Sequence, residues 1–183
     1  MDLRIERTRK SIINAFLELR AHKPIEKITV KELAELAYIN KATFYSHYKD
    51  IYDLTEQLED EAISTILKNI PHPEYIVTRP KAGFEELAYA MTAQSPLLTT
   101  LFSDSRASFF TNKLEQSLKE HIYALFPELK NNLEKDILLS VLIQGCFHAY
   151  ASHQNCELHT VIDILGDINE CLTTHYGSKS HCP

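Results

Sequence analysis

The chain is predicted to fold as an all-α protein, in which a small N-terminal three-helix domain is followed by a larger helical domain. Only 4 of its 183 residues are Gly and 7 are Pro, so few positions interrupt helices. Apolar residues recur at helical spacing, as at Leu54, Leu58 and Ala62. A length of 183 residues with 44% hydrophobic side chains suffices for a small domain joined to a larger one.

Charge is distributed unevenly along the chain. The net charge is -6, yet residues 1–50 contain ten Lys or Arg against seven acidic residues, whereas the remainder contains nine against eighteen. Binding to a polyanion requires only a local excess of cations. No apolar run approaches the roughly eighteen residues of a membrane span, and the charged N-terminus is unlike a signal peptide. We therefore expect a cytoplasmic protein without a membrane partner.

The first helix is predicted over about residues 3–20, because Ile5, Ile12 and Phe16 keep to one stripe. Basic residues gather near its start, at Arg4, Arg7, Arg9 and Lys10. These side chains can lie along a nucleic-acid backbone, or they can form an ordinary solvated helix end.

Two short helices are predicted between Ile28 and Lys49. Thr29 with Glu32 three residues later forms a capping box at the start of the first helix. That helix should stop near Tyr38, and Asn40 is the predicted cap of the second. Two short helices joined by a tight turn form a helix-turn-helix.

The outward face of the second helix carries a cation, hydrogen-bond donors and an aromatic hydroxyl, which suit a DNA groove. Lys41 lies in the first turn, where a recognition helix meets base edges. Phosphates and thymine methyl groups lie within reach of Thr43, Tyr45, His47 and Lys49. A solvated helix face would carry similar residues, so spacing alone leaves both interpretations open.

The run TVKELAELAYINKATFYSHYKDIYDL resembles the DNA-binding signature of the TetR family of transcriptional regulators. The resemblance covers about the first 55 residues and includes the Thr-Phe-Tyr-x-His-Tyr core of the second short helix. It implies DNA contacts from Thr29, Asn40, Lys41, Ala42, Thr43, Tyr45, His47 and Lys49. Two positions depart from the family pattern: Tyr38 stands where the turn usually has Gly, and Ile51 stands where a Lys often holds a phosphate.

A longer helix is predicted from Asp50, its cap, to about residue 70, where Pro71 and Pro73 end it. Residues 71–80 read as a linker. The helix should connect the two domains, with the boundary inside it. The predicted division is a helix-turn-helix domain at 1–55, a C-terminal domain at 56–177 and a tail at 178–183.

Five further helices are predicted, over about 81–94, 96–103, 106–125, 132–153 and 158–175. The fourth of these is apolar almost all round and must be covered on every side. In position, the last two resemble the pair through which the family dimerises. The interface residues that we expect are Val141, Gly145, Val161, Leu165, Ile168 and Leu172. Alternatively, both helices complete only the core of a monomer.

The C-terminal domain is rich in aromatic side chains, most of which are expected to be core. The resemblance implies a ligand-binding domain for a small-molecule effector, and an apolar pocket with a few polar groups would suit such a ligand. Its candidate residues are Phe84, Tyr89, Met91, Phe102, Phe109, Phe110, Tyr123, Gln144, Phe147 and His148.

Cysteine and histidine residues gather near one predicted helix-helix turn. The members of this cluster are Cys146, His148, His153, Cys156 and His159. Their spacings match no standard zinc site, so buried thiols and exposed imidazoles are favoured over metal binding. The sequence predicts no metal or cofactor. It contains no phosphate loop, nucleophile elbow or paired catalytic carboxylates, so we do not expect an enzyme.

Two functions follow as expectations. The first is a TetR-like regulator that binds a palindromic operator as a homodimer, acts as a repressor and is released by a small-molecule effector. The second is a helical sensor for a small molecule or metal, whose helix-turn-helix no longer binds an operator. The departures at Tyr38 and Ile51 favour the second.

Overall fold

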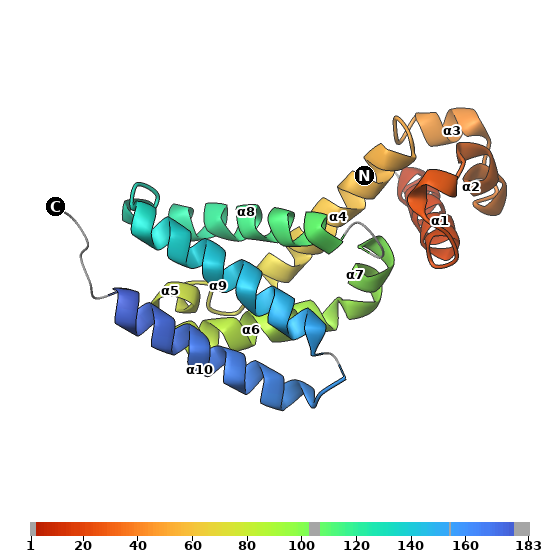
Figure 1. Cartoon of the computed structure of the whole chain (residues 1–183). Coiled ribbons are helices and arrows are strands. Elements are labelled where there is room, and N and C mark those ends of the chain that lie inside the picture. The colour runs from red at the N-terminus through yellow and green to blue at the C-terminus, as the bar shows by residue number, and fades with distance from the viewer. Residues whose placement is uncertain (1–2, 103–106, 154, 178–183) are drawn as a thin grey trace. The chain divides into compact units, whose positions relative to one another are not determined.

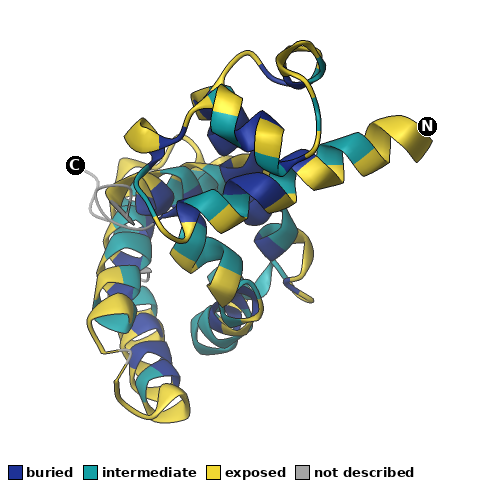
Figure 2. Ribbon diagram, turned by 90° about the vertical axis from the view of Figure 1, so that its right-hand side faces the viewer, coloured by how far each residue is buried: buried dark blue, intermediate teal, exposed yellow. Residues whose placement is uncertain are grey.

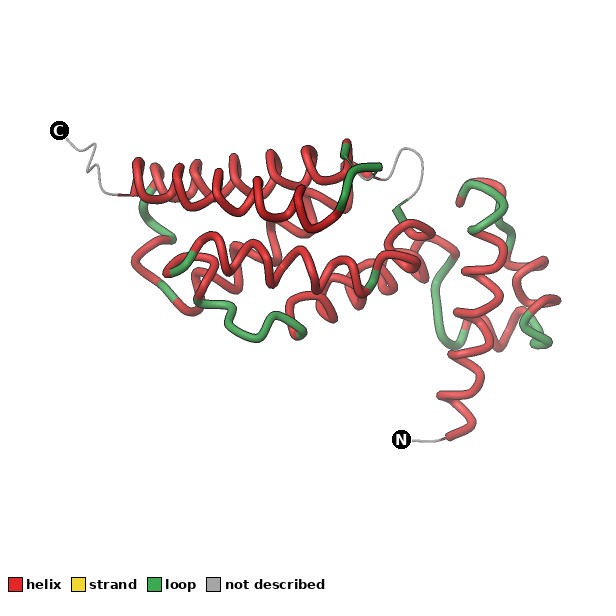
Figure 3. Tube along the Cα trace, turned by 90° about the horizontal axis from the view of Figure 1, so that it is seen from below, coloured by secondary structure: helices red, strands yellow, loops and turns green. Residues whose placement is uncertain are grey.

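The computed structural model describes residues 3–102, 107–153 and 155–177. All regular secondary structure in these ranges is helical, which confirms the predicted all-α fold (Figure 3). Among the described helices, none is both long enough and apolar enough to cross a membrane. The helices are α1 (Leu3–Arg20), η1 (Ile25–Lys27), α2 (Val30–Leu36), α3 (Lys41–Tyr45), α4 (Ile51–Lys68), α5 (Tyr75–Thr78), α6 (Pro80–Ala93), α7 (Ser95–Leu101), α8 (Ala107–Leu125), η3 (Pro127–Leu129), α9 (Leu133–Ser152) and α10 (Leu158–Gly177).

The chain divides into two compact units. The N-terminal unit comprises the described residues up to Ala62, together with those between Pro96 and Ala107. The C-terminal unit comprises Ile63–Ser95 and the described residues from Ser108 onward. The division falls within α4, so this one helix supplies residues to both units. The predicted tail at 178–183 lies outside the described residues.

The N-terminal unit is organised around α2, which packs against α1 and α3 (Figure 1). Its core consists of fully buried side chains at Phe16, Leu33, Phe44 and Leu54. Along α1 and α4, buried positions alternate with exposed ones as an amphipathic helix requires (Figure 2). Side chains of α1, α2 and α4 and of the short helix α3 thus share one apolar centre.

The start of α2 is capped as the sequence predicts, but only by one half of the predicted capping box. Thr29 Oγ1 accepts a hydrogen bond from the backbone N–H of Glu32 at 3.2 Å. The Glu32 carboxylate pairs with Lys23 Nζ, whereas the sequence predicts that it turns back to Thr29. Lys23 follows α1, so this ion pair ties the end of α1 to the start of α2.

The turn between α2 and α3 contains Tyr38 in the left-handed conformation, with φ of 55°. Backbone hydrogen bonds close the turn: Tyr38 N–H donates to Glu35 O at 3.2 Å, and Ile39 N–H donates to Ala34 O at 2.9 Å. The Tyr38 side chain is 96% exposed. Tyrosine thus adopts the backbone conformation that glycine takes without strain, and its ring contributes almost nothing to the core.

Replacement of Tyr38 by glycine is therefore expected to stabilise the N-terminal unit. The left-handed conformation costs a non-glycine residue about 1 to 2 kcal/mol, and glycine loses about 0.5 to 1 kcal/mol more backbone entropy on folding. We expect the free energy of unfolding to rise by about 0.5 to 1 kcal/mol in urea titrations followed by amide NMR signals of α1 to α3. The control Tyr38→Ala retains a Cβ atom and should give no gain. Equal stability of the two variants would contradict the strain at this turn.

The segment 71–80 is partly helical, which corrects its prediction as a linker. It contains α5, which packs against α6. Glycine makes this approach possible, because a Cβ atom at Gly83 would lie 2.4 Å from Ile76 N. His72 stacks on Tyr75 at 4.6 Å between ring centroids, and its backbone N–H donates to Glu86 at 2.9 Å. Sequence periodicity could not reveal a helix of four residues that depends on these contacts.

The C-terminal unit is built around α10, which packs against α6 and α9 (Figure 1). Lys81 of α6 forms ion pairs with Asp163 and Asp167 of α10, at 2.7 and 2.6 Å. Hydrogen bonds from Lys81 Nζ to these two carboxylates raise the pKa of Lys81 above its usual range. The ion pairs therefore lie beside the apolar contact between the two helices.

Candidate nucleic-acid interface and internal cavity

Helix α3 is held in place by a polar cap and by an aromatic anchor. Asn40 Oδ1 accepts hydrogen bonds from Thr43 N at 2.7 Å and from Thr43 Oγ1 at 3.1 Å. Phe44 and Tyr48 are buried, and their ring centroids lie 5.8 Å apart. The cap begins the helix at Lys41, and the anchor fixes which face points outward.

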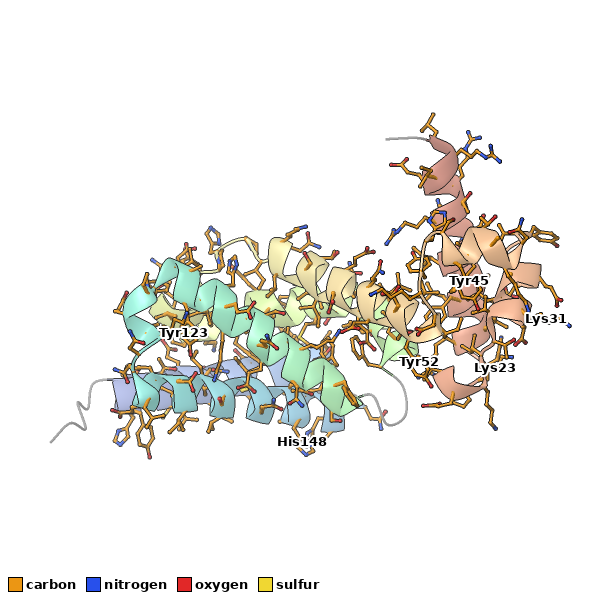
Figure 4. All side chains as sticks on the ribbon, turned by 90° about the horizontal axis from the view of Figure 1, so that it is seen from above. Lys23, Lys31, Tyr45, Tyr52, Tyr123 and His148 are labelled. Carbon is orange, nitrogen blue, oxygen red and sulfur yellow. The ribbon has the colours of Figure 1, made fainter. Side chains whose placement is uncertain are left out.

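Of the eight predicted DNA-contacting residues, four lie in α3 and Asn40 caps it, while Thr29 caps α2 and His47 and Lys49 follow α3; none of the eight is buried. Thr43 and His47 are half-buried. The other six are exposed: Thr29, Asn40, Lys41, Ala42, Tyr45 and Lys49. Figure 4 labels Tyr45 on this unit. Since Asn40 Oδ1 is used by the cap, its amide N–H groups are the donors left for another molecule.

The cations around α3 have different roles. Arg9 of α1 forms an ion pair with Glu61 and lies beside the Tyr48 hydroxyl, so it serves the fold of this unit. The hydrogen bond to Glu61 raises the pKa of Arg9, and burial raises the pKa of Tyr48. Arg7 and Lys10, in contrast, are exposed. Arg9 is therefore engaged within the fold, whereas Arg7 and Lys10 are exposed to solvent.

The second departure from the family pattern has a structural reason. Ile51 is buried at the start of α4, where it belongs to the core of the N-terminal unit. The neighbouring Lys49 exposes its side chain, while its backbone N–H donates to Asp53 Oδ2 at 2.8 Å. This hydrogen bond lowers the pKa of Asp53. Lys49 is thus the exposed cation nearest in sequence to the start of α4.

The C-terminal unit encloses a cavity lined by residues of α5, α6, α8, α9 and α10. The empty space in the cavity, including the part that is open to solvent, is about 660 Å³. The volume that is available to the centre of a water molecule is about 50 Å³. Of the ten pocket residues that the sequence predicts, Phe84, Met91 and Phe147 line this cavity. The enclosed part has room for a few water molecules or for a small ligand.

The other seven predicted pocket residues lie outside the cavity wall. Phe102 belongs to the N-terminal unit, Phe110 packs on Phe147 from behind, and Phe109 is exposed. Tyr89 bonds to His159 at 2.8 Å, Gln144 donates to Glu115 at 2.7 Å, and Tyr123 donates to Asp136. His148 is exposed (Figure 4).

Three polar residues line the cavity, Cys146, Tyr150 and Asn169. The aromatic content of the domain indicates Tyr150 as a possible pocket residue, but no pattern in the sequence points to Cys146 or Asn169. Cys146 and Tyr150 are four residues apart and so share one face of α9. That spacing was available in the sequence. The surrounding residues of α9 are apolar on nearly every face, so periodicity could not show which face turns inward.

A polar network lies between α8 and α9. Lys119 Nζ contacts Asp136 at 2.7 Å, Ser140 at 2.7 Å and Glu115 at 3.1 Å. Burial and the hydrogen bond to Asp136 raise the pKa of Tyr123 to about 12. The hydrogen bonds from Lys119 and Tyr123 lower the pKa of Asp136. The donors and carboxylates satisfy one another, so this network holds α8 and α9 together.

The predicted dimer residues divide between the core and the surface. Leu165 is only 8% exposed and belongs to the core of its own protomer, while Val161 and Leu172 are half-buried. Val141 and Ile168 are 55% and 44% exposed, and a Cβ atom at Gly145 would meet nothing within 4 Å. Leu165 faces inward because α10 covers α6 as well as α9, which the stripe on α10 alone could not show.

The cysteine and histidine cluster is dispersed in the structure. Cys146 is buried beside Asn169, and His153 Nδ1 lies 2.7 Å from Ala149 O. His148 and Cys156 are exposed, and His159 bonds to Tyr89. Within the described parts of the chain, no group of three His, Cys, Asp or Glu side chains could hold a metal ion.

Comparison of the sequence with protein-family models and with curated proteins finds no match for this chain. The described residues therefore define a class of protein by its fold alone. It is an all-α protein with a capped short helix presenting a polar face in one unit and an apolar cavity in the other.

Proposed function

We propose that the protein is a DNA-binding transcriptional regulator of the TetR type, which acts as a homodimer on a palindromic operator. The observation that carries this proposal is the geometry of α3. Buried Phe44 and Tyr48 fix the helix on one side, and the other side presents Lys41, Ala42 and Tyr45 to solvent. A recognition helix needs this division, because its inner face must be rigid while its outer face reads the groove.

The side chains of this surface have different roles in the proposed complex. Lys41 in the first turn of α3 reaches base edges, where a lysine favours guanine O6 and N7. Ala42 allows close approach and can contact a thymine methyl group. Phosphates are held by Thr29, Thr43, Tyr45, His47 and Lys49, which set the register of the helix without reading sequence.

The exposed apolar surface of α9 and α10 supports the proposed dimer. Val141 and Ile168 are joined there by Ile137 and Ile164, which are also exposed. Gly145 leaves room for a close approach of two helices. A two-fold dimer places two α3 helices on two half-sites, which are about one helical turn of DNA or a multiple of it apart.

The cavity of the C-terminal unit is the proposed site of a small-molecule effector that releases the repressor from its operator. α4 contributes residues to both units, so a ligand that favours one conformation of its C-terminal end could bias DNA binding. Only a difference in affinity between the two states can drive such a change. The usual coupling is about 1 to 3 kcal/mol, and operator must weaken effector binding by the same factor.

Two lysine variants test the proposal. Lys41→Ala should relax the base preference at one position of each half-site, with a loss of about 1 to 3 kcal/mol on the preferred operator. Lys49→Ala should weaken all sequences alike and reduce the slope of affinity against salt by about one unit for each phosphate that is no longer neutralised. Operators are first selected from genomic fragments, and binding is then measured by fluorescence anisotropy at several salt concentrations.

Lys130→Ala is the matched control, because it removes an exposed lysine from the other unit. It should change neither base preference nor salt slope. If the unmodified chain binds no DNA fragment even at low salt, the helical-sensor alternative replaces this proposal. If both variants lose the same factor of affinity for the operator and for random DNA, the chain still binds DNA, but the assignment of Lys41 to a base edge is wrong.

A further inference from the structure

The chemistry of the cavity wall restricts what the cavity can bind. Its wall is almost entirely apolar, and among the described residues no charged side chain lines it. Three polar side chains interrupt the apolar surface: Cys146 and Tyr150 of α9, and Asn169 of α10. An ion would lose its hydration here without gaining a partner of opposite charge, so a charged ligand is disfavoured.

Asn169 offers the cavity an acceptor. Its side chain belongs to a residue that is only 7% exposed, and Nδ2 donates to Cys146 Sγ at 3.0 Å and to Leu165 O at 3.4 Å. The Leu165 carbonyl fixes the orientation of the amide, because the opposite orientation would turn two oxygens toward each other. No donor within the described ranges of the chain reaches Oδ1. Oδ1 is not sealed from solvent, so its donor can be water or a hydroxyl or N–H group of a ligand that takes the place of that water.

Tyr150 offers a second acceptor. Thr92 Oγ1 lies 2.9 Å from Ala88 O, to which it can donate, and 3.2 Å from Tyr150 Oη, where either hydroxyl can be the donor. In both arrangements a lone pair on Tyr150 Oη stays available. Burial raises the pKa of the Cys146 thiol, which is therefore neutral at physiological pH and only a weak donor.

We propose that the cavity binds an uncharged, largely apolar molecule of about the size of one aromatic ring, which carries a hydroxyl or N–H group that donates to Asn169 Oδ1. The role of this molecule as an effector rests on the proposed function, whereas its binding does not. Met91 on the wall has a flexible side chain, which can adapt to a ligand larger than the enclosed space.

Phenol and toluene are the matched probes, because they have nearly the same shape and differ in a hydroxyl against a methyl group. Toluene is the more hydrophobic of the two and would bind more tightly to a purely apolar cavity. With a donor satisfying Asn169, phenol should bind about tenfold more tightly than toluene.

The chain carries its own reporter of binding at this site. It contains two methionines, Met1 and Met91, and Met91 lines the cavity. In protein labelled with ¹³C at the methionine methyl groups, titration of either probe should shift the Met91 signal and leave the Met1 signal unchanged. The dissociation constants follow from the Met91 titration curves, and no DNA is required.

Asn169→Leu removes the acceptor while approximately conserving side-chain volume, so the preference should reverse and toluene should bind more tightly than phenol. Asn112→Leu is the control, because Asn112 is an exposed residue of α8 outside the cavity wall. It should keep the preference for phenol. If Asn169→Leu does not fold, anisole serves as a further probe of the unmodified protein: it keeps the oxygen atom of phenol but has no proton to donate, so it should bind no more tightly than toluene.

The proposal is overturned if toluene binds the unmodified protein as tightly as phenol, or if neither probe shifts the Met91 signal. It is likewise overturned if Asn169→Leu folds and keeps the preference for phenol. Failure of the proposed function gives a different result, in which phenol binds as expected but the protein binds no operator. If the protein binds neither phenol nor any operator, each proposal is refuted by its own experiment.

Discussion

Replacement of Gly83 by alanine is expected to lower the free energy of unfolding of the C-terminal unit by about 3 kcal/mol. A Cβ atom at this position would lie 2.4 Å from Ile76 N and 2.5 Å from Tyr75 C. Both are backbone atoms of α5, so they cannot rotate aside as a side chain would. Relief requires α5 to move off α6, and overpacking of this kind costs about 1 to 3 kcal/mol or more.

The matched control is Gly166→Ala in α10. A Cβ atom there would lie 3.0 Å from Lys81 Cγ, which belongs to a flexible side chain. Alanine also favours the helix by about 1 kcal/mol over glycine, so this variant should have nearly unchanged stability. Urea titrations followed by the Met91 methyl signal would measure both variants. If Gly83→Ala were as stable as Gly166→Ala, the close packing of α5 on α6 would be wrong.

The sequence predicted the helices well where local chemistry decides their ends. The observed bounds lie within two residues of the predicted ones for α1, α4, α6 and the later long helices. Thr29 and Asn40 begin their helices because the side-chain oxygen of each accepts a hydrogen bond from the backbone N–H three residues later. This interaction involves only residues that are close in sequence. Residues that signal such events can be recognised without knowledge of the rest of the fold.

The cavity could not be predicted in the same way. Aromatic residues were an indication of apolar surface, but the sequence does not say which side of α8 or α9 each one faces. Phe110 and Phe147 contact each other at 5.1 Å, yet only Phe147 reaches the cavity. Asn169 was missed because a single asparagine in an amphipathic helix usually lies in solvent, and its burial depends on how α10 packs against α9.

Charges placed on the exposed faces of α9 and α10 are expected to prevent dimerisation. Val141→Asp and Ile168→Asp place a charge on exposed positions, so each protomer should keep its fold and stability. In the proposed dimer the same charges are buried without partners, and association should fail. Loss of the second half-site then weakens operator binding by about 100-fold or more. Leu165→Asp should instead unfold the protomer, because Leu165 lies in its core.

Sedimentation velocity at micromolar concentration, together with circular dichroism, separates these outcomes. The unmodified chain should sediment as a dimer, and Val141→Asp and Ile168→Asp should sediment as folded monomers. Glu157→Asp is a suitable control, because it keeps the charge of an exposed residue outside the apolar face. An unmodified chain that is monomeric at this concentration would exclude the dimer. Variants that remain dimeric would show that the two protomers meet through another surface, because an unpaired carboxylate cannot be buried at such an interface without a large loss of affinity.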